Sequence, residues 1–228
     1  MPNTEKTLEK RFDATLSMVK DSSCKGFTLD IGCGENPYIF HEHLNNYVGM
    51  DIDISILKKL SENLHDVSLI CASGSHAPFK DHSFDLIICT EVLEHLKNPE
   101  EMISEMNRVL TKEGKAIVSI PTLSLPQIVI LWIAYKTKRI SEKPYQTPHH
   151  VIEYARFKVT PHFEKTSNLF KLFRRNELEI QDVVTVQSLY AKPKIIYNIF
   201  LSKIERVFKR FFSKRLIGHY TVFRAEKK

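Results

Sequence analysis

The segment Leu29-Asp30-Ile31-Gly32-Cys33-Gly34-Glu35-Asn36-Pro37 carries the clearest structural signal in the chain. It joins an apolar run, typical of a buried strand, to a pattern typical of a helix. Glycines at positions 32 and 34 let the backbone turn sharply at this point and approach a ligand closely. A Gly-x-Gly pair also occurs in plain tight turns, but its place between a strand and a helix favours a ligand-binding loop.

On both sides of this segment, apolar runs alternate with helical patterns from Phe27 to Pro121. Runs that are apolar throughout are typical of strands buried on both faces of a parallel sheet. We expect such strands at 27–31, 47–50, 67–71, 84–89 and 115–120. Helices are expected between them at 37–44, 55–64 and 99–110, the last with Asn98 as its N-cap. This alternation predicts a doubly wound α/β sheet.

After Pro121 the pattern becomes less regular. It predicts helices at 125–135, 163–176 and 195–212, and strands at 180–186 and 219–224, with a loop rich in Pro and His at 144–150. We expect this half of the chain to add helical insertions and two strands to the far edge of the sheet.

The composition is that of an ordinary globular protein, with 43% hydrophobic and 26% charged residues and a formal charge of +6. It excludes a disordered tail, a disulfide miniprotein and a collagen-like fibre. Residues 1–21 are too polar for a signal peptide, and no apolar run reaches the roughly 20 residues of a membrane-spanning helix. The scattered cysteines fit free thiols. We therefore expect a cytoplasmic protein.

Asp51 ends the second expected strand, 17 residues after Gly34. A carboxylate at this place can accept hydrogen bonds from both hydroxyls of a ribose. Alternatively, Asp51 is a solvated residue or the N-cap of the next helix. A nicotinamide dehydrogenase is disfavoured because its fingerprint requires a third glycine, where this chain has Pro37.

Five segments follow one another in an order and spacing that resemble the class I S-adenosylmethionine-dependent methyltransferases, especially the type-11 group. They are Leu29–Gly34, Val48–Asp51, Ala77–Asp85, Glu91–Leu96 and Arg108–Lys115. The resemblance implies a Rossmann-like, mostly parallel sheet of seven strands, with S-adenosylmethionine as cofactor. Residues 1–228 would form a single methyltransferase domain, with a cofactor-binding core at 25–121 and an acceptor-side elaboration at 122–228.

The resemblance also implies roles for the glycine loop and the residues near it. Asp30 would hold the methionine ammonium, and the backbone of Gly32, Cys33 and Gly34 would lie against the methionine and ribose portions. Asp51 would bind the ribose diol.

Three further residues receive cofactor roles from the resemblance. Ile52 would pack against adenine, and the backbone of Thr90 would lie near the reactive sulfonium. The family normally offers an acidic residue to the adenine amino group, but Ser73 stands at that position here. Backbone groups of Gly74 and Ser75 would then share in adenine recognition.

Two histidines are candidates for a general base. His95 follows the fourth strand at the ligand-binding edge of the sheet, although it could equally be a structural residue. Glu94 beside it could orient His95 or be a plain loop carboxylate. His150 lies in segment 148–154, which resembles an acceptor-covering lid. A metal site there would need a more distant ligand, His162, and we expect no metal.

Segment 192–215 contains eight Lys and Arg residues and one Glu, a net charge of +7, so the remainder of the chain carries −1. Large apolar residues recur along it at helical spacing. Such a basic amphipathic helix either covers the sheet or lies on an anionic membrane surface. Nucleic acid is a less favoured partner, because no RNA-binding module accompanies the charge.

Together these features predict methyl transfer to a small-molecule, sugar or lipid-linked acceptor, at oxygen. The alternative is a protein of methyltransferase fold that binds the cofactor, or is recruited to a membrane, without catalysis. The protein would be cytoplasmic, either free or attached peripherally to a membrane surface through segment 192–215.

Overall fold

The structure is a computed structural model of the chain. It describes residues 2–35, 38–44, 46–64, 67–121, 152–154, 157–159, 166–186 and 220–228. Three features of the sequence lie outside these residues: His150 with most of the lid segment, the apolar segment 125–135 and the basic segment 192–215. The helical insertions expected there are therefore not described.

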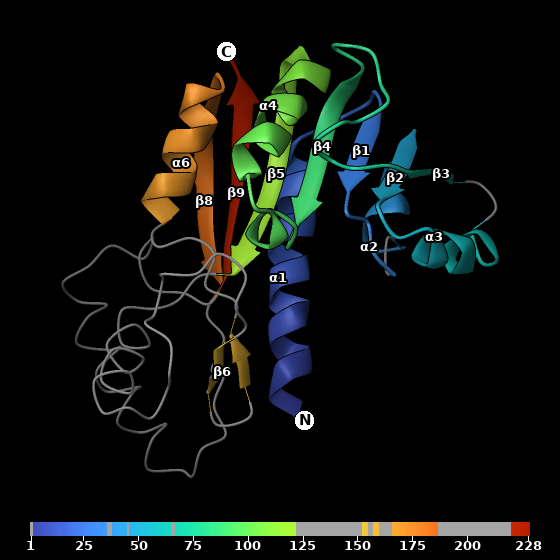
Figure 1. Cartoon of the computed structure of the whole chain (residues 1–228), viewed down its shortest axis with the longest axis vertical. Helices are drawn as coiled ribbons and strands as arrows, with labels where there is room; N and C mark the ends of the chain where they lie inside the picture. The colour runs from blue at the N-terminus through green and yellow to red at the C-terminus, as the bar shows by residue number, and fades with distance from the viewer. Residues whose placement is uncertain are drawn as a thin grey trace.

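The main sheet has seven strands in the order β3-β2-β1-β4-β5-β9-β8 (Figure 1). Their bounds are β1 Thr28–Ile31, β2 Tyr47–Asp51, β3 Ser68–Cys71, β4 Phe84–Thr90, β5 Leu110–Pro121, β8 Leu178–Val186 and β9 Tyr220–Lys227. Strand β9 runs antiparallel to its neighbours β5 and β8, and the pairs from β3 to β5 are parallel. This confirms the predicted doubly wound, mostly parallel sheet of seven strands. A separate antiparallel pair is formed by β6 Ile152–Tyr154 and β7 Phe157–Val159.

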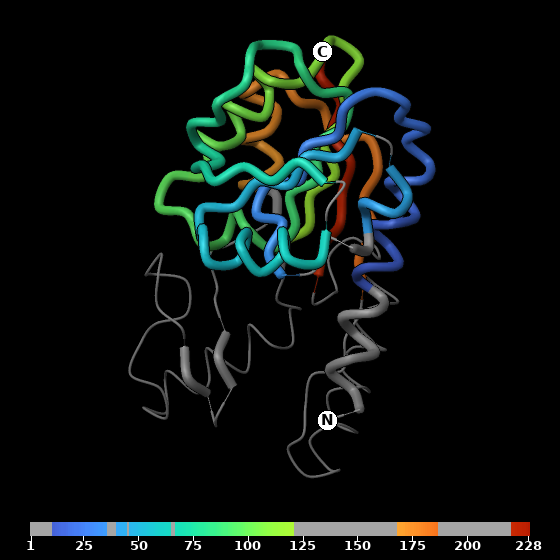
Figure 2. The backbone as a smooth tube through the Cα atoms, turned by 90° about the vertical axis from the view of Figure 1, so that its right-hand side faces the viewer, coloured from blue at the N-terminus to red at the C-terminus, as the bar shows by residue number. Residues whose placement is uncertain are grey.

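Helices cover both faces of the sheet. They are α1 Pro2–Asp21, α2 Tyr38–His41, α3 Ile54–Ser61, α4 Pro99–Val109 and α6 Thr166–Arg175, with a 3₁₀ turn η1 at Leu93–His95. Helices α4 and α6 lie on one face and α1 on the other (Figures 1 and 2).

The sequence of β4 is apolar at nearly every position because the strand is buried on both faces. Ile87 and Cys89 belong to the core shared with α4 and α6, whereas Leu86 and Ile88 belong to the core shared with α1. All four side chains are fully buried. A strand with helices on both faces has no solvent-facing side, so the usual alternation of apolar and polar residues is lost.

Some local expectations need correction. Strand β5 begins at Leu110, directly after α4, and not at residue 115 as expected, so Gly114 lies inside the strand. Asn98 is the N-cap residue of α4 as expected, but its side chain makes no capping hydrogen bond; its amide donates instead to Glu101 Oε1 at 2.9 Å. Helix α1 was not expected, because the polar N-terminal sequence shows only a narrow apolar stripe that includes Met18 and Val19, both buried.

The strand order reverses between β1 and β4, because β2 and β3 continue to one side and β5 to the other. In open α/β sheets, ligands bind outside the carboxyl ends of the strands at such a switch point. The residues that follow β1, β2 and β4 therefore define the place to search for a site.

Candidate active site

The glycine loop after β1 is held against the end of β2. The backbone N–H groups of Gly32 and Cys33 both donate to the Met50 carbonyl, at 2.7 and 3.2 Å. Gly32 and Gly34 have φ angles of +70° and +60°, which favour glycine. A Cβ on Gly32 would lie 2.3 Å from Val92 Cγ2, so residue 32 has no room for a side chain.

Asp51 closes the other side of this loop. Its Oδ2 accepts from the Gly34 N–H at 3.0 Å, and its Oδ1 accepts from the Asp53 N–H at 2.9 Å. The N-cap of α3 is Asp53, whose side chain accepts from the Ser55 N–H at 2.8 Å. The alternative of a capping role for Asp51 is therefore wrong, and its carboxylate lies at the glycine loop.

Asp30 is buried at the centre of the site, with 2% of its surface exposed. Its Oδ2 accepts from the Tyr47 hydroxyl at 2.5 Å, and its Oδ1 has no hydrogen-bond partner among the described residues. Burial raises the pKa of the Asp30 carboxyl to about 7, with a further contribution from Asp51, while the Tyr47 hydrogen bond opposes the shift. A buried acceptor without a partner is costly, so this oxygen is suited to a cationic donor such as an ammonium group.

Two residues near the loop complete the cofactor side. Cys33 is buried, and its pKa is raised to about 12 by burial and by the nearby Asp30 and Asp51 carboxylates. The thiol is therefore protonated and contributes packing. Tyr47 was not anticipated from the sequence; its pKa is raised by burial and by Asp30, so it remains a hydrogen-bond donor.

The expected adenine-binding residues lie on the loops after β2 and β3. Ile52 is 75% exposed, an unusual state for a large apolar side chain and one that leaves it free to cover an aromatic ring. The loops are joined by the Ala72 N–H, which donates to the Asp51 carbonyl at 3.1 Å. Ser73 is half-buried, and its Oγ accepts from the Ser75 N–H at 3.3 Å.

At the end of β4, Thr90 leads into a polar cluster that we call the β4-end cluster: Arg11, Glu91, Glu94, His95 and Ser119. Glu91 adopts a left-handed φ of +58°. Its Oε1 accepts from the Ser119 hydroxyl at 2.9 Å, and its Oε2 lies 3.2 Å from Arg11 Nη1. Arg11 reaches the cluster from α1, with its guanidinium 5.2 Å from the centre of the Tyr220 ring.

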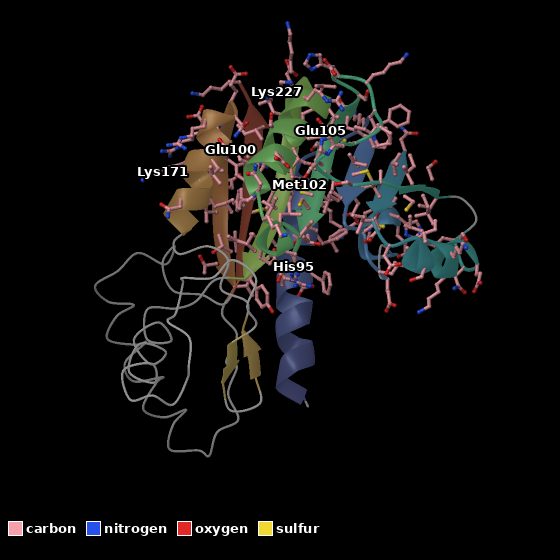
Figure 3. The ribbon with its side chains drawn as sticks, viewed as in Figure 1. His95, Glu100, Met102, Glu105, Lys171 and Lys227 are labelled. Carbon is pink, nitrogen blue, oxygen red and sulfur yellow. The ribbon has the colours of Figure 1, made fainter. Side chains whose placement is uncertain are left out.

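Glu94 and His95 lie side by side in η1 but in different environments. The Glu94 side chain is 2% exposed, and its Oε2 has no hydrogen-bond partner among the described residues. Burial, and then the charge of Glu91, raise the pKa of the Glu94 carboxyl to about 9. His95 is 62% exposed, with Nε2 3.9 Å from Glu94 Oε1. Figure 3 places His95 at the end of the sheet opposite Lys227 and Glu105.

The structure therefore brings together most of the residues expected from the sequence. Asp30, the glycine loop and Asp51 meet at one point, with Ile52 and Ser73 on adjoining loops and Thr90 at the end of the neighbouring strand. His150 and His162 lie outside the described residues. Within the described part of the chain, no group of three His, Cys, Asp or Glu residues could hold a metal ion. None of the helices in that part is long and apolar enough to span a membrane.

Fold and site together define an α/β protein with a candidate cofactor site at the switch point of its sheet. A family model described as a methyltransferase domain matches residues 29–118. Residues 29–118 therefore resemble a methyltransferase domain, as the sequence predicts, and this resemblance indicates S-adenosylmethionine as the cofactor.

Two relatives illustrate the match in sequence. The chain is 38% identical over 109 residues to the uncharacterized protein MJ0638 of Methanocaldococcus jannaschii, covering 46% of each chain. It is 27% identical over 116 residues to the malonyl-[acyl-carrier protein] O-methyltransferase of Marinomonas sp., covering 48% of this chain and 43% of that protein. The matches therefore span about half the length of these curated relatives.

Solved structures show the same fold over most of the chain. A putative methyltransferase from Bacillus halodurans gives a TM-score of 0.62 at 17% identity, covering 93% of this chain and 98% of that one. The 1,6-didemethyltoxoflavin-N1-methyltransferase of Burkholderia thailandensis, solved with S-adenosylhomocysteine bound, gives a TM-score of 0.60 at 14% identity, covering 95% and 78%.

Proposed function

We propose that this chain transfers the methyl group of S-adenosylmethionine to a hydroxyl oxygen of a small-molecule, sugar or lipid-linked acceptor. The observation that carries the proposal is the meeting of three features at the switch point: a glycine loop with no room for a side chain, a carboxylate closing it, and a buried carboxyl oxygen without a partner. The glycine loop fits the methionine and ribose portions of the cofactor, the Asp51 carboxylate fits the ribose diol, and the free oxygen of Asp30 fits the methionine ammonium.

The residues present fit this cofactor. The free Oδ1 of Asp30 would accept a hydrogen bond from the methionine ammonium and so remove the cost of its burial. The glycine loop would allow close backbone approach. Each Asp51 oxygen accepts one backbone hydrogen bond and retains capacity for a ribose hydroxyl. Ile52 would cover the adenine ring, and Ser73 would lie near its edge.

When bound, the cofactor supplies a methyl group already activated by a sulfonium leaving group. The main task of the protein is then to align the acceptor with that methyl, and effective molarities of roughly 10⁵ M are reached in good intramolecular cases. A hydroxyl acceptor must also lose its proton, and a positioned base contributes roughly 10²–10⁴-fold to such a step. The β4-end cluster supplies the nearby titratable groups.

Two observations support the acceptor side of the proposal. One relative is named an O-methyltransferase, which supports transfer to oxygen. The net charge of +7 on segment 192–215, with its apolar spacing, supports contact with an anionic membrane surface and hence a lipid-linked acceptor.

Calorimetry tests the cofactor site. S-Adenosylmethionine and S-adenosylhomocysteine should both bind the wild-type chain, and Asp51→Ala should weaken binding roughly 10- to 100-fold through loss of charge-assisted hydrogen bonds. Asp85→Ala makes the same chemical change on an exposed residue near the start of β4 and should leave binding unchanged. No binding by the wild-type chain would refute the proposal.

Transfer itself is tested with methyl-labelled cofactor and an extract of the source cells. Label should enter an extractable small molecule or lipid, and Asp51→Ala should prevent this. Cofactor binding without any transfer would favour the alternative, a binding module without catalysis.

The membrane surface is tested by co-sedimentation with phosphatidylcholine vesicles with and without phosphatidylserine. Binding should require phosphatidylserine and decrease at high salt. Replacing Lys209 and Arg210 by Glu should abolish it, whereas the same charge reversal at the exposed Lys58 and Lys59 of α3 should not. Equal absence of binding to both vesicle types would remove the membrane from the proposal.

A further inference from the structure

We propose that the Glu94 carboxyl is the proton acceptor of the methyl-transfer step and that His95 passes the proton from Glu94 to solvent. This inference rests on the proposed function and assigns to Glu94 the base role that the sequence favours for His95. It also restricts the acceptor to a group that loses a proton during transfer, such as a hydroxyl.

Glu94 lies in the turn that follows β4, four residues after Thr90, at the edge of the sheet where the cofactor site lies. Its side chain is 2% exposed, yet Oε2 has no partner among the described residues. A buried carboxyl oxygen is costly to leave unpaired, and it persists most readily where a ligand group completes it. An acceptor hydroxyl is such a group.

The groups around the Glu94 carboxyl determine how readily it ionises. Cys89 of β4, Glu91, Arg11 of α1 and His95 are the charged or titratable groups near it. Burial and Glu91 favour the protonated form, whereas Arg11 favours the ionised form. Once ionised, a carboxyl with a raised pKa is a stronger base than an ordinary glutamate and matches a weakly acidic hydroxyl better. Glu94 is protonated in the chain without cofactor, and the positive charge of a bound sulfonium would favour the ionised form that accepts the proton.

In this proposal, the proton on Glu94 reaches solvent through His95. Glu94 is enclosed, whereas His95 is 62% exposed and has Nε2 3.9 Å from Glu94 Oε1. An imidazole can receive a proton on one nitrogen and release one from the other. In this proposal, Oε2 would take the proton from the acceptor and Oε1, the oxygen near His95, would pass it on.

The step balances without an oxidant or reductant. The acceptor O–H proton moves to Glu94 Oε2, and the acceptor oxygen forms the new bond to the methyl carbon. The electron pair of the broken carbon–sulfur bond stays on sulfur, so the products are a methyl ether and S-adenosylhomocysteine. Glu94 then returns its proton to solvent through His95.

The test compares proton exchange on binding of S-adenosylmethionine and S-adenosylhomocysteine, and it needs no acceptor. Both ligands carry the ammonium that Asp30 would bind, but only S-adenosylmethionine carries the sulfonium charge. Calorimetry in buffers of different ionisation enthalpy gives the number of protons released. At pH 8, a sulfonium that lowers the pKa of Glu94 from about 9 by one unit releases roughly 0.4 proton that S-adenosylhomocysteine does not.

Variants at Glu94 and His95 test whether the additional proton released with S-adenosylmethionine comes from Glu94. Glu94→Gln should abolish the difference between the two ligands, and His95→Asn should preserve it. If Glu94→Gln does not fold, Arg11→Met provides a second measurement: loss of the Arg11 charge should shift the release of the proton to higher pH. Arg108→Met removes an arginine from the opposite end of α4 and should cause no shift.

Two outcomes oppose this inference in distinguishable ways. If neither ligand binds the wild-type chain, the proposed function itself is wrong. If both ligands bind but release equal numbers of protons, or if Glu94→Gln retains the difference, Glu94 is not the proton acceptor.

Discussion

The cofactor side of the site and the β4-end cluster are assembled in different ways. On the cofactor side, residues 30–34 form one short segment, the end of β1 followed by the glycine loop, and their partners Tyr47, Met50 and Asp51 come from the adjacent parallel strand. In the β4-end cluster, Glu91 is held by Arg11, 80 positions earlier in the chain, and by Ser119, 28 positions later. One is fixed by local backbone geometry, the other by side chains from distant segments.

This difference has a consequence for how each region tolerates change. Backbone conformation on the cofactor side depends on residues that permit positive φ and leave space. The β4-end cluster depends on the balance of buried charges, with Arg11 opposing Glu91 and Glu94. Substitutions should therefore affect cofactor affinity on one side and pH dependence or stability on the other.

The largest effect is expected from Gly32→Ala. The new Cβ would lie 2.3 Å from Val92 Cγ2 at a φ of +70°, so the loop or Val92 must move. We expect affinity for S-adenosylhomocysteine to fall roughly 100-fold, as measured by calorimetry, from strain and clash together.

Gly34→Ala is the matched control for this change. Its φ is also positive, at +60°, but the nearest atom to a new Cβ is 3.9 Å away. Only backbone strain of roughly 1–2 kcal/mol is introduced, so affinity should fall at most about 5- to 30-fold, less than for Gly32→Ala. Equal losses in the two variants would show that the space at residue 32 is unimportant.

Within the β4-end cluster, Glu94→Gln should cause the largest change in the pH dependence of stability. The pKa of Glu94 is raised in the folded chain from 4.5 to about 9. As pH rises from 4.5 toward 9, the unfolded chain ionises while the folded chain stays protonated, so the wild type loses stability that the glutamine variant keeps.

The Tm of Glu94→Gln should therefore exceed that of the wild type at pH 8.5 by several degrees, given roughly 2–4 °C per kcal/mol for a chain of this size. The difference should vanish near pH 5. Glu100→Gln, at an exposed position on α4, is the control. A Tm difference that does not change with pH would contradict the assignment of a buried, protonated Glu94.

The sequence predicted the cofactor side much better than the β4-end cluster, for a physical reason. Positive φ, tight turns and strand ends leave marks within a few residues, so Gly32, Gly34 and Asp51 could be located from spacing alone. Tyr47 required the register of β1 and β2. Arg11 and Ser119 required knowledge that α1 and β5 meet at the end of β4, which no local pattern records.

Arg108 is a second residue whose contacts could not be predicted from local sequence. It was singled out as part of a family motif, but its guanidinium donates to the carbonyls of Ala77 and Phe79 at 3.1 and 2.9 Å. It also binds Glu105 and Asp81. Arg108 thus links the loop before β4 to α4.

Arg11→Met tests most directly whether the β4-end cluster contributes to stability without affecting cofactor affinity. It leaves Glu91 without its ionic partner, and the free energy of unfolding should fall by about 1.5–3 kcal/mol in urea titrations near pH 7. Affinity for S-adenosylhomocysteine should change less than two-fold. Lys59→Met removes an exposed pair with Glu35 and should cost under about 1 kcal/mol. A loss of cofactor affinity in Arg11→Met would mean that the two regions are coupled.

The smallest predicted effect concerns Asp30 and the pH dependence of cofactor binding. Its pKa is about 7, so the fraction of Asp30 that carries a charge rises between pH 6 and pH 8. Because the ionised form attracts an ammonium group, affinity for S-adenosylhomocysteine should rise up to about 10-fold over this range, or about 1.4 kcal/mol.

Asp30→Asn should abolish this pH dependence and bind weakly throughout. Tyr47→Phe should instead move it to higher pH, because the Tyr47 hydrogen bond lowers the pKa of Asp30. The Tyr47 result is the more discriminating one. If Asp30 only packed against β2, removing the hydroxyl would weaken binding equally at every pH, whereas an ammonium-binding carboxyl must shift its titration.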